Sequence, residues 1–225
     1  MADFPFDIVG FDLDGTLIDT SGDLAAAVNY TLKEAGRPAL IPETVKTMIG
    51  GGAKVMLQHG LATTGGCEAL EFRSYYKAML GYYEANISTY SRPFPGALAA
   101  LDALDGLGVK TAVVTNKFEN LARKLLTDLG LIDRFATVIG GDTLGPGKAK
   151  PAGDPILEMV ARSGGGRAAF IGDSIADMMA AKNANVPNIA VSFGFLLQPV
   201  EELCADEIIN RYDELIPTLR TLCAT

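Results

Sequence analysis

The sequence predicts an α/β fold, a doubly wound parallel sheet with an all-helical segment inserted after the first strand. From residue 96 onward, short apolar runs alternate with amphipathic helical patterns, as in parallel sheets covered on both faces. Residues 21–91 show helical patterns and no strand pattern. The chain has 225 residues, 48% of them hydrophobic, which is enough for a sizeable core. We therefore expect a core domain formed by residues 1–20 and 92–225 and a helical domain formed by residues 21–91.

The spacing of apolar residues along the chain predicts where each strand and helix lies. The apolar run at residues 8–11 is too short for a helix and predicts the first strand. Four helices are then expected at 22–36, 44–49, 53–61 and 68–85. After Gly96, strands at 110–115, 135–140, 167–172, 188–192 and 207–210 alternate with helices at 97–107, 119–129, 154–162, 175–184 and 212–222. Ligands of such sheets bind at the carboxyl ends of the strands, so residues that follow strands are the first candidates for chemistry.

Charge and composition narrow the classes of partner. The net charge of -8 argues against a nucleic-acid partner. No apolar stretch reaches the ~20 residues of a membrane span, and the acidic start lacks the basic region of a signal peptide, so no membrane partner is expected. Three widely spaced cysteines, Cys67, Cys204 and Cys223, favour reduced thiols and a cytoplasmic protein. His59 is the sole histidine and no G-x-S-x-G motif occurs, so a serine triad is not expected. The oligomeric state stays unknown.

Two carboxylates, Asp12 and Asp14, follow the first strand and precede Gly15-Thr16. Alternate residues of an extended chain point the same way, so the two side chains can converge. Like charges persist there only if a cation neutralises them or one holds a proton. A plain Asp-Gly turn is the structural alternative. An EF-hand calcium loop does not fit, because it requires glycine at its sixth position, where Leu17 stands.

Two later strands are also followed by polar residues. Thr115 and Asn116 come after the run that begins at residue 110, and Asn116 is expected as a wall of the site. Asp173 and Asp177 come after the run that ends at residue 172, and Lys150 lies in the loop between these two strands. If the strands are neighbours, one crevice holds carboxylates, a hydroxyl and a lysine. Such a set suits Mg²⁺ beside a phosphate.

The segments DxDGT, TN, KP and GDSxxxD resemble, in this order and over nearly the whole chain, the four motifs of the haloacid dehalogenase superfamily in its phosphatase form. The resemblance implies a Rossmann-like core, a helical cap and a magnesium-dependent phosphatase with an aspartyl-phosphate intermediate. It makes Asp12 the nucleophile and Asp14 the general acid and then the base. Thr115 and Lys150 would hold the phosphoryl oxygens. Asp12, the Asp14 carbonyl and Asp173 would bind the metal.

Several of these assignments have alternatives. Asp173 could also cap the helix that follows it. Asp177 either orients Lys150 or a metal-bound water, or is an exposed helix residue. Lys148 is an alternative to Lys150 as the catalytic lysine. Related phosphatases often carry K-P-x-P-x-P in this loop, whereas Gly153 stands here in place of the middle proline, which leaves the rigidity of the loop in question.

The helical segment is similar to the cap of the subclass that contains phosphoglycolate phosphatases, β-phosphoglucomutases and some pyrophosphatases. Gly50, Gly51 and Gly52 open a helix, whose free N–H groups suit a small anion such as a carboxylate, and Lys54 adds positive charge. This segment and the opening DLDGTLIDTSGDL resemble phosphoglycolate phosphatases, which implies 2-phosphoglycolate as the substrate. Alternatively, the glycines form only a tight turn and Lys54 is solvated.

Two other functions stay open at this point. A β-phosphoglucomutase-like sugar phosphomutase could use the same core. A non-catalytic phospho-acceptor or binding module is the second, since receiver domains also combine an acidic magnesium pocket with a lysine. The presence of Asp14 and of the inserted helices argues against such a module.

Overall fold

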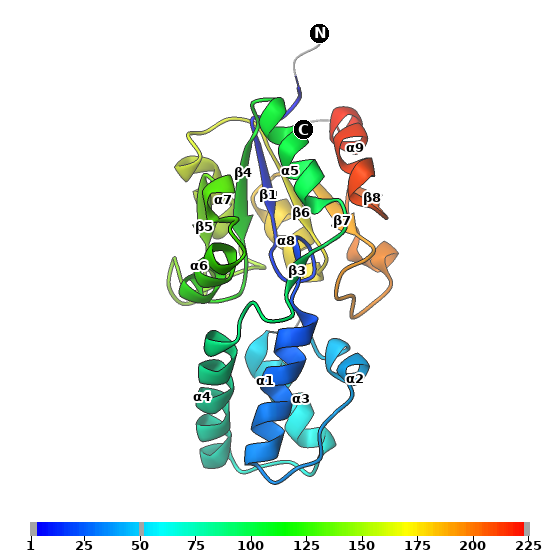
Figure 1. Cartoon of the computed structure of the whole chain (residues 1–225). Coiled ribbons are helices and arrows are strands. Elements are labelled where there is room, and N and C mark those ends of the chain that lie inside the picture. Colours follow the sequence, from blue (N-terminus) through cyan, green and yellow to red (C-terminus); the bar gives the residue numbers. More distant parts are fainter. Residues whose placement is uncertain (1–3, 50–51, 223–225) are drawn as a thin grey trace.

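The computed structural model describes residues 4–49 and 52–222 and confirms the predicted α/β fold. Six parallel strands form one sheet in the order β5-β4-β1-β6-β7-β8. They are β1 (Ile8–Phe11), β4 (Lys110–Val114), β5 (Thr137–Ile139), β6 (Ala168–Gly172), β7 (Asn188–Val191) and β8 (Glu207–Ile209). Strand β1 lies in the middle of the sheet, between β4 and β6 (Figure 1). The residues that follow these three strands are therefore neighbours.

Helices cover both faces of the sheet. One face packs against α5 (Ala97–Gly106), α6 (Glu119–Asp128) and α9 (Leu215–Thr221), and the other against α7 (Asp154–Arg162) and α8 (Ile175–Asn183). The side chains of β1 alternate accordingly, since Val9 and Phe11 face the first group and Ile8 the second. Burial on both faces explains why the strands are continuous apolar runs.

Four helices form a second body below the sheet (Figure 1). They are α1 (Ser21–Glu34), α2 (Pro42–Lys46), α3 (Ala53–Thr63) and α4 (Ala69–Ala85). Their buried apolar side chains, including Val28, Leu32 and Leu57, join the same hydrophobic cluster as the adjacent face of the sheet. Among the described residues from 21 to 91 there is no strand, in agreement with the sequence. We refer to α1–α4 as the cap and to the sheet with its helices as the core.

Two short strands that the sequence did not predict lie where the chain passes between core and cap. Strand β2 (Ile18–Asp19) pairs antiparallel with β3 (Arg92–Pro93). Beside them, the buried Asp23 carboxylate accepts hydrogen bonds from the N–H groups of Tyr90 and Ser91 and from the Ser91 hydroxyl, at 2.6 to 3.1 Å. The two connections are thus held together. A two-residue strand has no periodicity to read, which is why the pair was missed.

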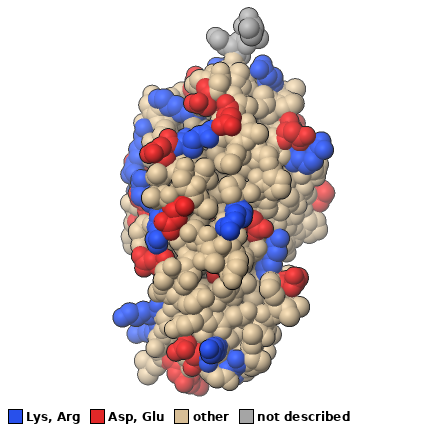
Figure 2. Space-filling view, viewed as in Figure 1, with Lys and Arg blue, Asp and Glu red and all other residues tan. Residues whose placement is uncertain are grey.

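The remaining differences are at the ends of predicted elements and in short 3₁₀ helices that were not predicted. The expected strand at 135–140 is only Thr137–Ile139 and follows a 3₁₀ helix, Ile132–Arg134. The expected helix at 212–222 begins with a 3₁₀ turn, Tyr212–Glu214, and another 3₁₀ helix, Val200–Leu203, was not foreseen. On the face shown in Figure 2, acidic and basic side chains are interspersed over core and cap. None of the described helices is long and apolar enough to cross a bilayer.

Candidate active site

A cavity of about 150 Å³ lies between the carboxyl ends of the central strands and the cap. The core contributes residues that come after β1, β4 and β6, together with Lys150 from the loop before α7, and most of them are charged or polar. The cap contributes a largely apolar wall. The core residues are Asp12, Asp14, Thr115, Asn116, Lys117, Phe118, Leu121, Lys150, Asp173, Ser174 and Ala176. The cap residues are Leu24, Ala27, Ile49, Gly52, Ala53, Met56, Tyr76, Met79, Leu80 and Tyr83. The fold thus brings together Asp12, Asp14, Thr115, Lys150 and Asp173, as the sequence predicts.

Lys150 is the centre of the buried network on the core side. Its ammonium group donates to Asp12 Oδ1 at 2.8 Å, to the Val114 carbonyl at 2.8 Å and to Asp177 Oδ1 at 2.5 Å. An ammonium group has three protons, so these acceptors use all of them. The Lys150 side chain is only 3% exposed. Burial alone would lower the pKa of Lys150, but Asp12 and Asp177 raise it above its ordinary value. Lys150 is therefore a permanent, fixed cation.

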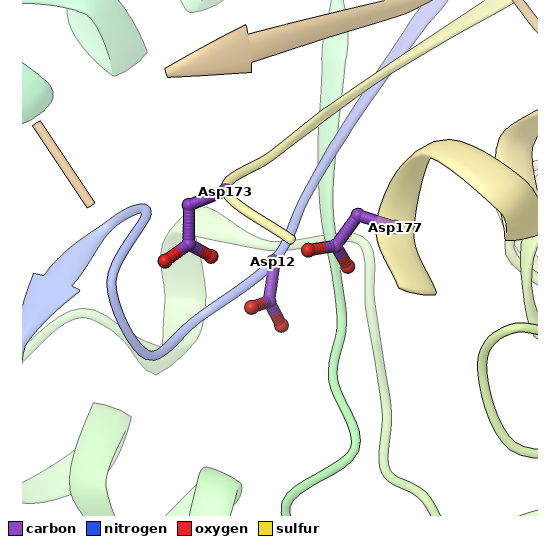
Figure 3. Close-up of side chains that lie close together, drawn as sticks. All are labelled: Asp12, Asp173 and Asp177. Carbon is purple, nitrogen blue, oxygen red and sulfur yellow. The ribbon is translucent and has the colours of Figure 1, made fainter. Parts of the chain in front are cut away.

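Three carboxylates converge beside this lysine. Figure 3 shows Asp12 between Asp173 and Asp177, and oxygen atoms of the three lie within 4.8 Å of one another. Burial raises the pKa of Asp12 to about 7, against the opposing effect of Lys150, and Asp177 raises it further. Burial, Asp12 and Asp177 together raise the pKa of Asp173 well above its ordinary value. The cluster is thus an environment that favours an additional cation.

The chain around Asp173 holds its carboxylate in one position. Oδ2 accepts the Phe195 N–H at 2.7 Å and Oδ1 accepts the Thr16 hydroxyl at 3.2 Å. Gly15 has φ +87, and a side chain at this position would collide with the Asp173 carboxylate. The glycine of the DxDG segment therefore provides both the turn and the space for Asp173. Sequence reasoning missed Phe195, since no motif marks the loop after β7.

The donor set of the cluster fits a divalent metal ion. Among the described residues only Lys150 donates to the Asp12 side chain, and it does so at Oδ1, which leaves Oδ2 available. Asp177 is occupied by Lys150 and by the start of α8, so Asp12 and Asp173 are the side chains placed to bind a metal. Carboxylate oxygens are ligands that hard divalent cations prefer.

Asp14 belongs to a separate ion pair that sequence reasoning missed. Lys117 donates to both of its carboxylate oxygens, at 2.7 and 2.8 Å, and the Thr20 hydroxyl donates at 2.8 Å. Asp12 and Asp14 follow β1, which ends at Phe11, and both line the cavity. Each carboxylate has its own lysine. The available signal was the lysine in the TNK segment directly after Thr115 and Asn116.

The start of α8 decides between the alternatives for two residues. Ser174, and not Asp173, is the N-cap of this helix, and its hydroxyl and N–H contact Asp177 in a capping box. The alternative of Asp173 as a cap is therefore wrong. Asp177 is fully buried against Lys150, so an exposed helix position for Asp177 is also wrong. Lys148 lies outside the cavity and forms an exposed ion pair with Asp154 at 3.5 Å.

The loops after β4 and around Lys150 support one another. The Thr115 hydroxyl accepts the Lys117 N–H at 3.1 Å, and the Asn116 amide donates to the Lys150 carbonyl at 3.0 Å. At Gly153 an added Cβ would lie 2.8 Å from the carbonyl carbon of Asn183. Close packing against α8 explains why this position, which is proline in related loops, is glycine here. Contacts with α8 thus take the place of the middle proline, while Pro151 and Pro155 remain in the loop.

The cap wall carries few polar groups. Gly52, with φ +84, precedes α3 and lines the cavity, whereas Gly50 and Gly51 lie outside the described residues. Lys54 is exposed in a separate groove between α3 and α4. Tyr83 is buried on the wall, and burial raises the pKa of its hydroxyl to about 12. At neutral pH this hydroxyl is therefore a neutral hydrogen-bond donor.

The sheet, the inserted cap and the carboxylate–lysine site are those of a hydrolase family. Residues 9–191 match the haloacid dehalogenase-like hydrolases, and the chain belongs to this family. The phosphoglycolate phosphatase of Caulobacter vibrioides is 41% identical over 207 residues, which are 91% of this chain and 86% of that protein. The phosphoglycolate phosphatase of Agrobacterium fabrum is 40% identical over 213 residues, 93% of this chain and 90% of that protein.

A solved structure shows the same fold at lower identity. The crystal structure of a predicted phosphoglycolate phosphatase from Haemophilus somnus superposes with a TM-score of 0.87 and 29% identity. The superposition covers 95% of this chain and 98% of that one, so it includes the cap as well as the core.

Proposed function

We propose that this protein is a magnesium-dependent phosphatase that hydrolyses 2-phosphoglycolate to glycolate and phosphate. The observation that carries the proposal is the buried Asp12, fixed by Lys150 and adjacent to Asp173, on the wall of a small cavity. A carboxylate in this setting can act as a nucleophile toward a phosphate whose charge is compensated nearby. The family and the names of the relatives also make the chain a phosphomonoester hydrolase.

The reaction takes place in two displacements at phosphorus. An Asp12 oxygen forms a bond to phosphorus while the bond to the glycolate oxygen breaks, and a protonated Asp14 gives its proton to that oxygen. Water then forms a bond to the phosphorus of the aspartyl-phosphate while the bond from phosphorus to the Asp12 oxygen breaks, which releases phosphate and restores the Asp12 carboxylate. Asp14, which is paired with Lys117, accepts a proton from the attacking water. Thr115 and the Lys150 charge stabilise the phosphoryl group. Mg²⁺, held by Asp12, Asp173 and the Asp14 carbonyl, would neutralise the phosphoryl oxygens.

The size and lining of the cavity support a small substrate. Pockets for drug-sized ligands enclose roughly 300–1,000 Å³. The cavity here has a volume of about 150 Å³ and is lined on its cap side by apolar residues such as Met56 and Met79. A two-carbon phosphate ester suits this space better than a nucleotide does. Relatives named phosphoglycolate phosphatase point to the same ester.

The rival functions have less support. The Caulobacter and Agrobacterium relatives are named as phosphatases, which favours hydrolysis over a sugar phosphomutase. A receiver-like binding module does not account for the cap that covers Asp12 and Asp14. We also propose a cytoplasmic location, which agrees with Cys67 and Cys204 being unpaired thiols.

Phosphate release from a panel of esters tests the proposal. The panel contains 2-phosphoglycolate, sugar phosphates, nucleotides and pyrophosphate, each assayed with magnesium and with chelator. We expect magnesium-dependent turnover with 2-phosphoglycolate well ahead of the others. A different leading ester would leave the phosphatase chemistry in place and refute the substrate. Isomerisation of a sugar phosphate that requires a bisphosphate activator would instead establish the mutase.

A further inference from the structure

The two lysines that line the cavity are used in different ways. All three protons of Lys150 are taken by Asp12, Asp177 and a backbone carbonyl, so this lysine belongs to the phosphoryl end of the site. Lys117 gives two hydrogen bonds to one carboxylate, that of Asp14. Its side chain is 7% exposed and borders the cavity. Lys117 is therefore a second buried cation at the cavity, and it is paired with Asp14.

Tyr83 approaches Lys117 from the opposite wall. It belongs to α4 of the cap, and its ring centre lies 4.8 Å from Lys117 Nζ. The Tyr83 hydroxyl is buried beside the Lys117 ammonium group, which can only donate, and no described residue accepts the hydroxyl proton with hydrogen-bond geometry. Buried polar atoms in native structures are nearly always hydrogen-bonded. An unsatisfied hydroxyl on the wall of a substrate cavity indicates a ligand that supplies the missing acceptor.

The surroundings of this hydroxyl show what kind of ligand fits. The cap wall near it is apolar, with Leu24, Met79 and Leu80 among its residues. An anionic group placed there needs donors of its own, because burying an unpaired charge is strongly unfavourable. Lys117 of the core and Tyr83 of the cap lie next to each other and offer one cationic and one neutral donor. A carboxylate, with two acceptor oxygens, matches such a pair.

The position relative to Asp14 agrees with the length of 2-phosphoglycolate. Asp14 serves the ester oxygen of the leaving group in the proposed reaction, and Lys117 Nζ lies 2.7 Å from Asp14. In 2-phosphoglycolate the carboxylate carbon is two bonds from that ester oxygen. A group that touches Asp14 therefore lies within reach of the carboxylate.

We propose that Lys117 and Tyr83 form the subsite that binds the carboxylate of the substrate and so determine specificity for acidic phosphate esters. The inference rests on the proposed phosphoglycolate hydrolysis. It assigns to Lys117 a contact with the substrate in addition to its pairing with Asp14, and it makes Tyr83 a specificity-determining residue supplied by the cap. A bound substrate would then contact the core through Lys117 and the cap through Tyr83.

The test compares 2-phosphoglycolate with 2-hydroxyethyl phosphate, in which a neutral hydroxymethyl group replaces the carboxylate. The variants are Tyr83→Phe, which removes only the hydroxyl, and Lys117→Met, which removes the charge. Tyr82→Phe is the matched control, because Tyr82 is the adjacent residue of α4 and stacks on Tyr30 outside the cavity. KM and kcat are measured for both esters. Damage to Asp14 in Lys117→Met affects both esters, so the ratio of their kcat/KM values isolates the carboxylate contact.

We expect Tyr83→Phe to raise KM for 2-phosphoglycolate roughly tenfold, the loss typical of one hydrogen bond to a charged group. The same variant should change KM for 2-hydroxyethyl phosphate by less than about twofold, as should Tyr82→Phe for both esters. Lys117→Met should lower the kcat/KM ratio of the two esters by at least about tenfold. Equal losses on both esters in both variants would overturn the inference while leaving the proposed function intact.

The substrate preference of the wild-type enzyme distinguishes failure of the proposed function from failure of the carboxylate subsite. If it already prefers 2-hydroxyethyl phosphate, the proposed substrate and the carboxylate subsite both fall. If it prefers 2-phosphoglycolate and the variants keep that preference, only the subsite falls. As an independent readout, calorimetric titration of 2-phosphoglycolate into Asp12→Asn should show weaker binding when Tyr83→Phe is added. Unchanged affinity in the double variant would count against the subsite.

Discussion

The two walls of the cavity differ in how their polar groups are satisfied. On the core wall, Asp12, Asp14 and Asp173 each have a partner of fixed geometry, two of them a lysine. On the cap wall most residues are apolar, and no described residue accepts the proton of the Tyr83 hydroxyl. The core wall is thus organised before the substrate arrives, whereas the cap wall is completed by it. In the proposed reaction the chemistry depends on the core wall, and substrate choice depends on Lys117 of the core wall together with Tyr83 of the cap wall.

The largest effect is expected from replacing the nucleophile of the core wall, Asp12. Asp12→Asn keeps the shape of the side chain and can still accept from Lys150, but it cannot form the acyl phosphate. We expect turnover to fall by at least about a thousandfold in a phosphate-release assay. The thermal unfolding midpoint of the metal-free protein should stay near that of the wild type. Substantial residual turnover would contradict the assignment of Asp12.

Lys150 tests whether the core wall depends on its internal charge pairing. Lys150→Met leaves the buried carboxylates of Asp12 and Asp177 without their cation. We expect the free energy of unfolding to fall by about 3–5 kcal/mol, together with activity, in a denaturant titration at neutral pH. Lys148→Met is the matched control two residues away, since its ion pair is exposed and should contribute under about 1 kcal/mol. Similar losses in both variants would refute the distinction.

Replacing Asp14 tests whether it acts as the general acid while Asp12 acts as the nucleophile. If it protonates the leaving oxygen, Asp14→Asn should slow esters with poor leaving groups, such as 2-phosphoglycolate, roughly 10²–10⁴-fold. p-Nitrophenyl phosphate, whose leaving group needs little protonation, should lose much less. The comparison is made as kcat for both substrates under saturating magnesium. Equal losses would mean that Asp14 does not act as the acid.

The pH dependence of the free energy of unfolding of the metal-free protein tests the charge state of the core wall independently of catalysis. Burial raises the pKa of Asp12 to about 7 from 3.8, so the folded state holds a proton that the unfolded state has released. The resulting stabilisation is complete below the unfolded pKa and is lost as the pH rises through the folded pKa. Between pH 6 and pH 8 the free energy of unfolding should fall by about 1.4 kcal/mol, measured in chelator.

Two additions make this measurement specific for the cluster. Asp12→Asn should show a flatter pH dependence, because the titrating group is gone. Saturating magnesium should also remove the fall, since a bound cation compensates the carboxylate charges. A pH dependence that is unchanged in Asp12→Asn would assign the effect to other groups.

The smallest effect is expected on the outer side of the cap. Lys54 is exposed in the groove between α3 and α4 and does not line the cavity. Lys54→Ala should therefore change kcat and KM for 2-phosphoglycolate by less than about twofold. A large rise in KM would show that the cap moves Lys54 toward the substrate, and it would transfer part of the anion recognition to the start of α3.

Much of the fold and the core of the site could be predicted from the sequence. The apolar runs before Asp12, Thr115 and Asp173 are buried parallel strands, and such strands leave a local signature in both length and composition. The same chemistry-bearing residues follow these strands directly. Once β1, β4 and β6 are neighbours, their positions are fixed by the chain itself. Lys150 does not directly follow a strand, and its place in the site could be predicted from its motif.

Only the tertiary structure decided which charge pairs with which. The pairing of Asp14 with Lys117, the burial of Asp177 against Lys150 and the contact of Phe195 with Asp173 join residues that are 22 to 103 positions apart. Tyr83 likewise reaches the cavity only because the cap packs over the core. Hydrophobic period and motif spacing report local geometry. Ion pairs between distant segments depend on burial and on directions that the assembled fold alone determines.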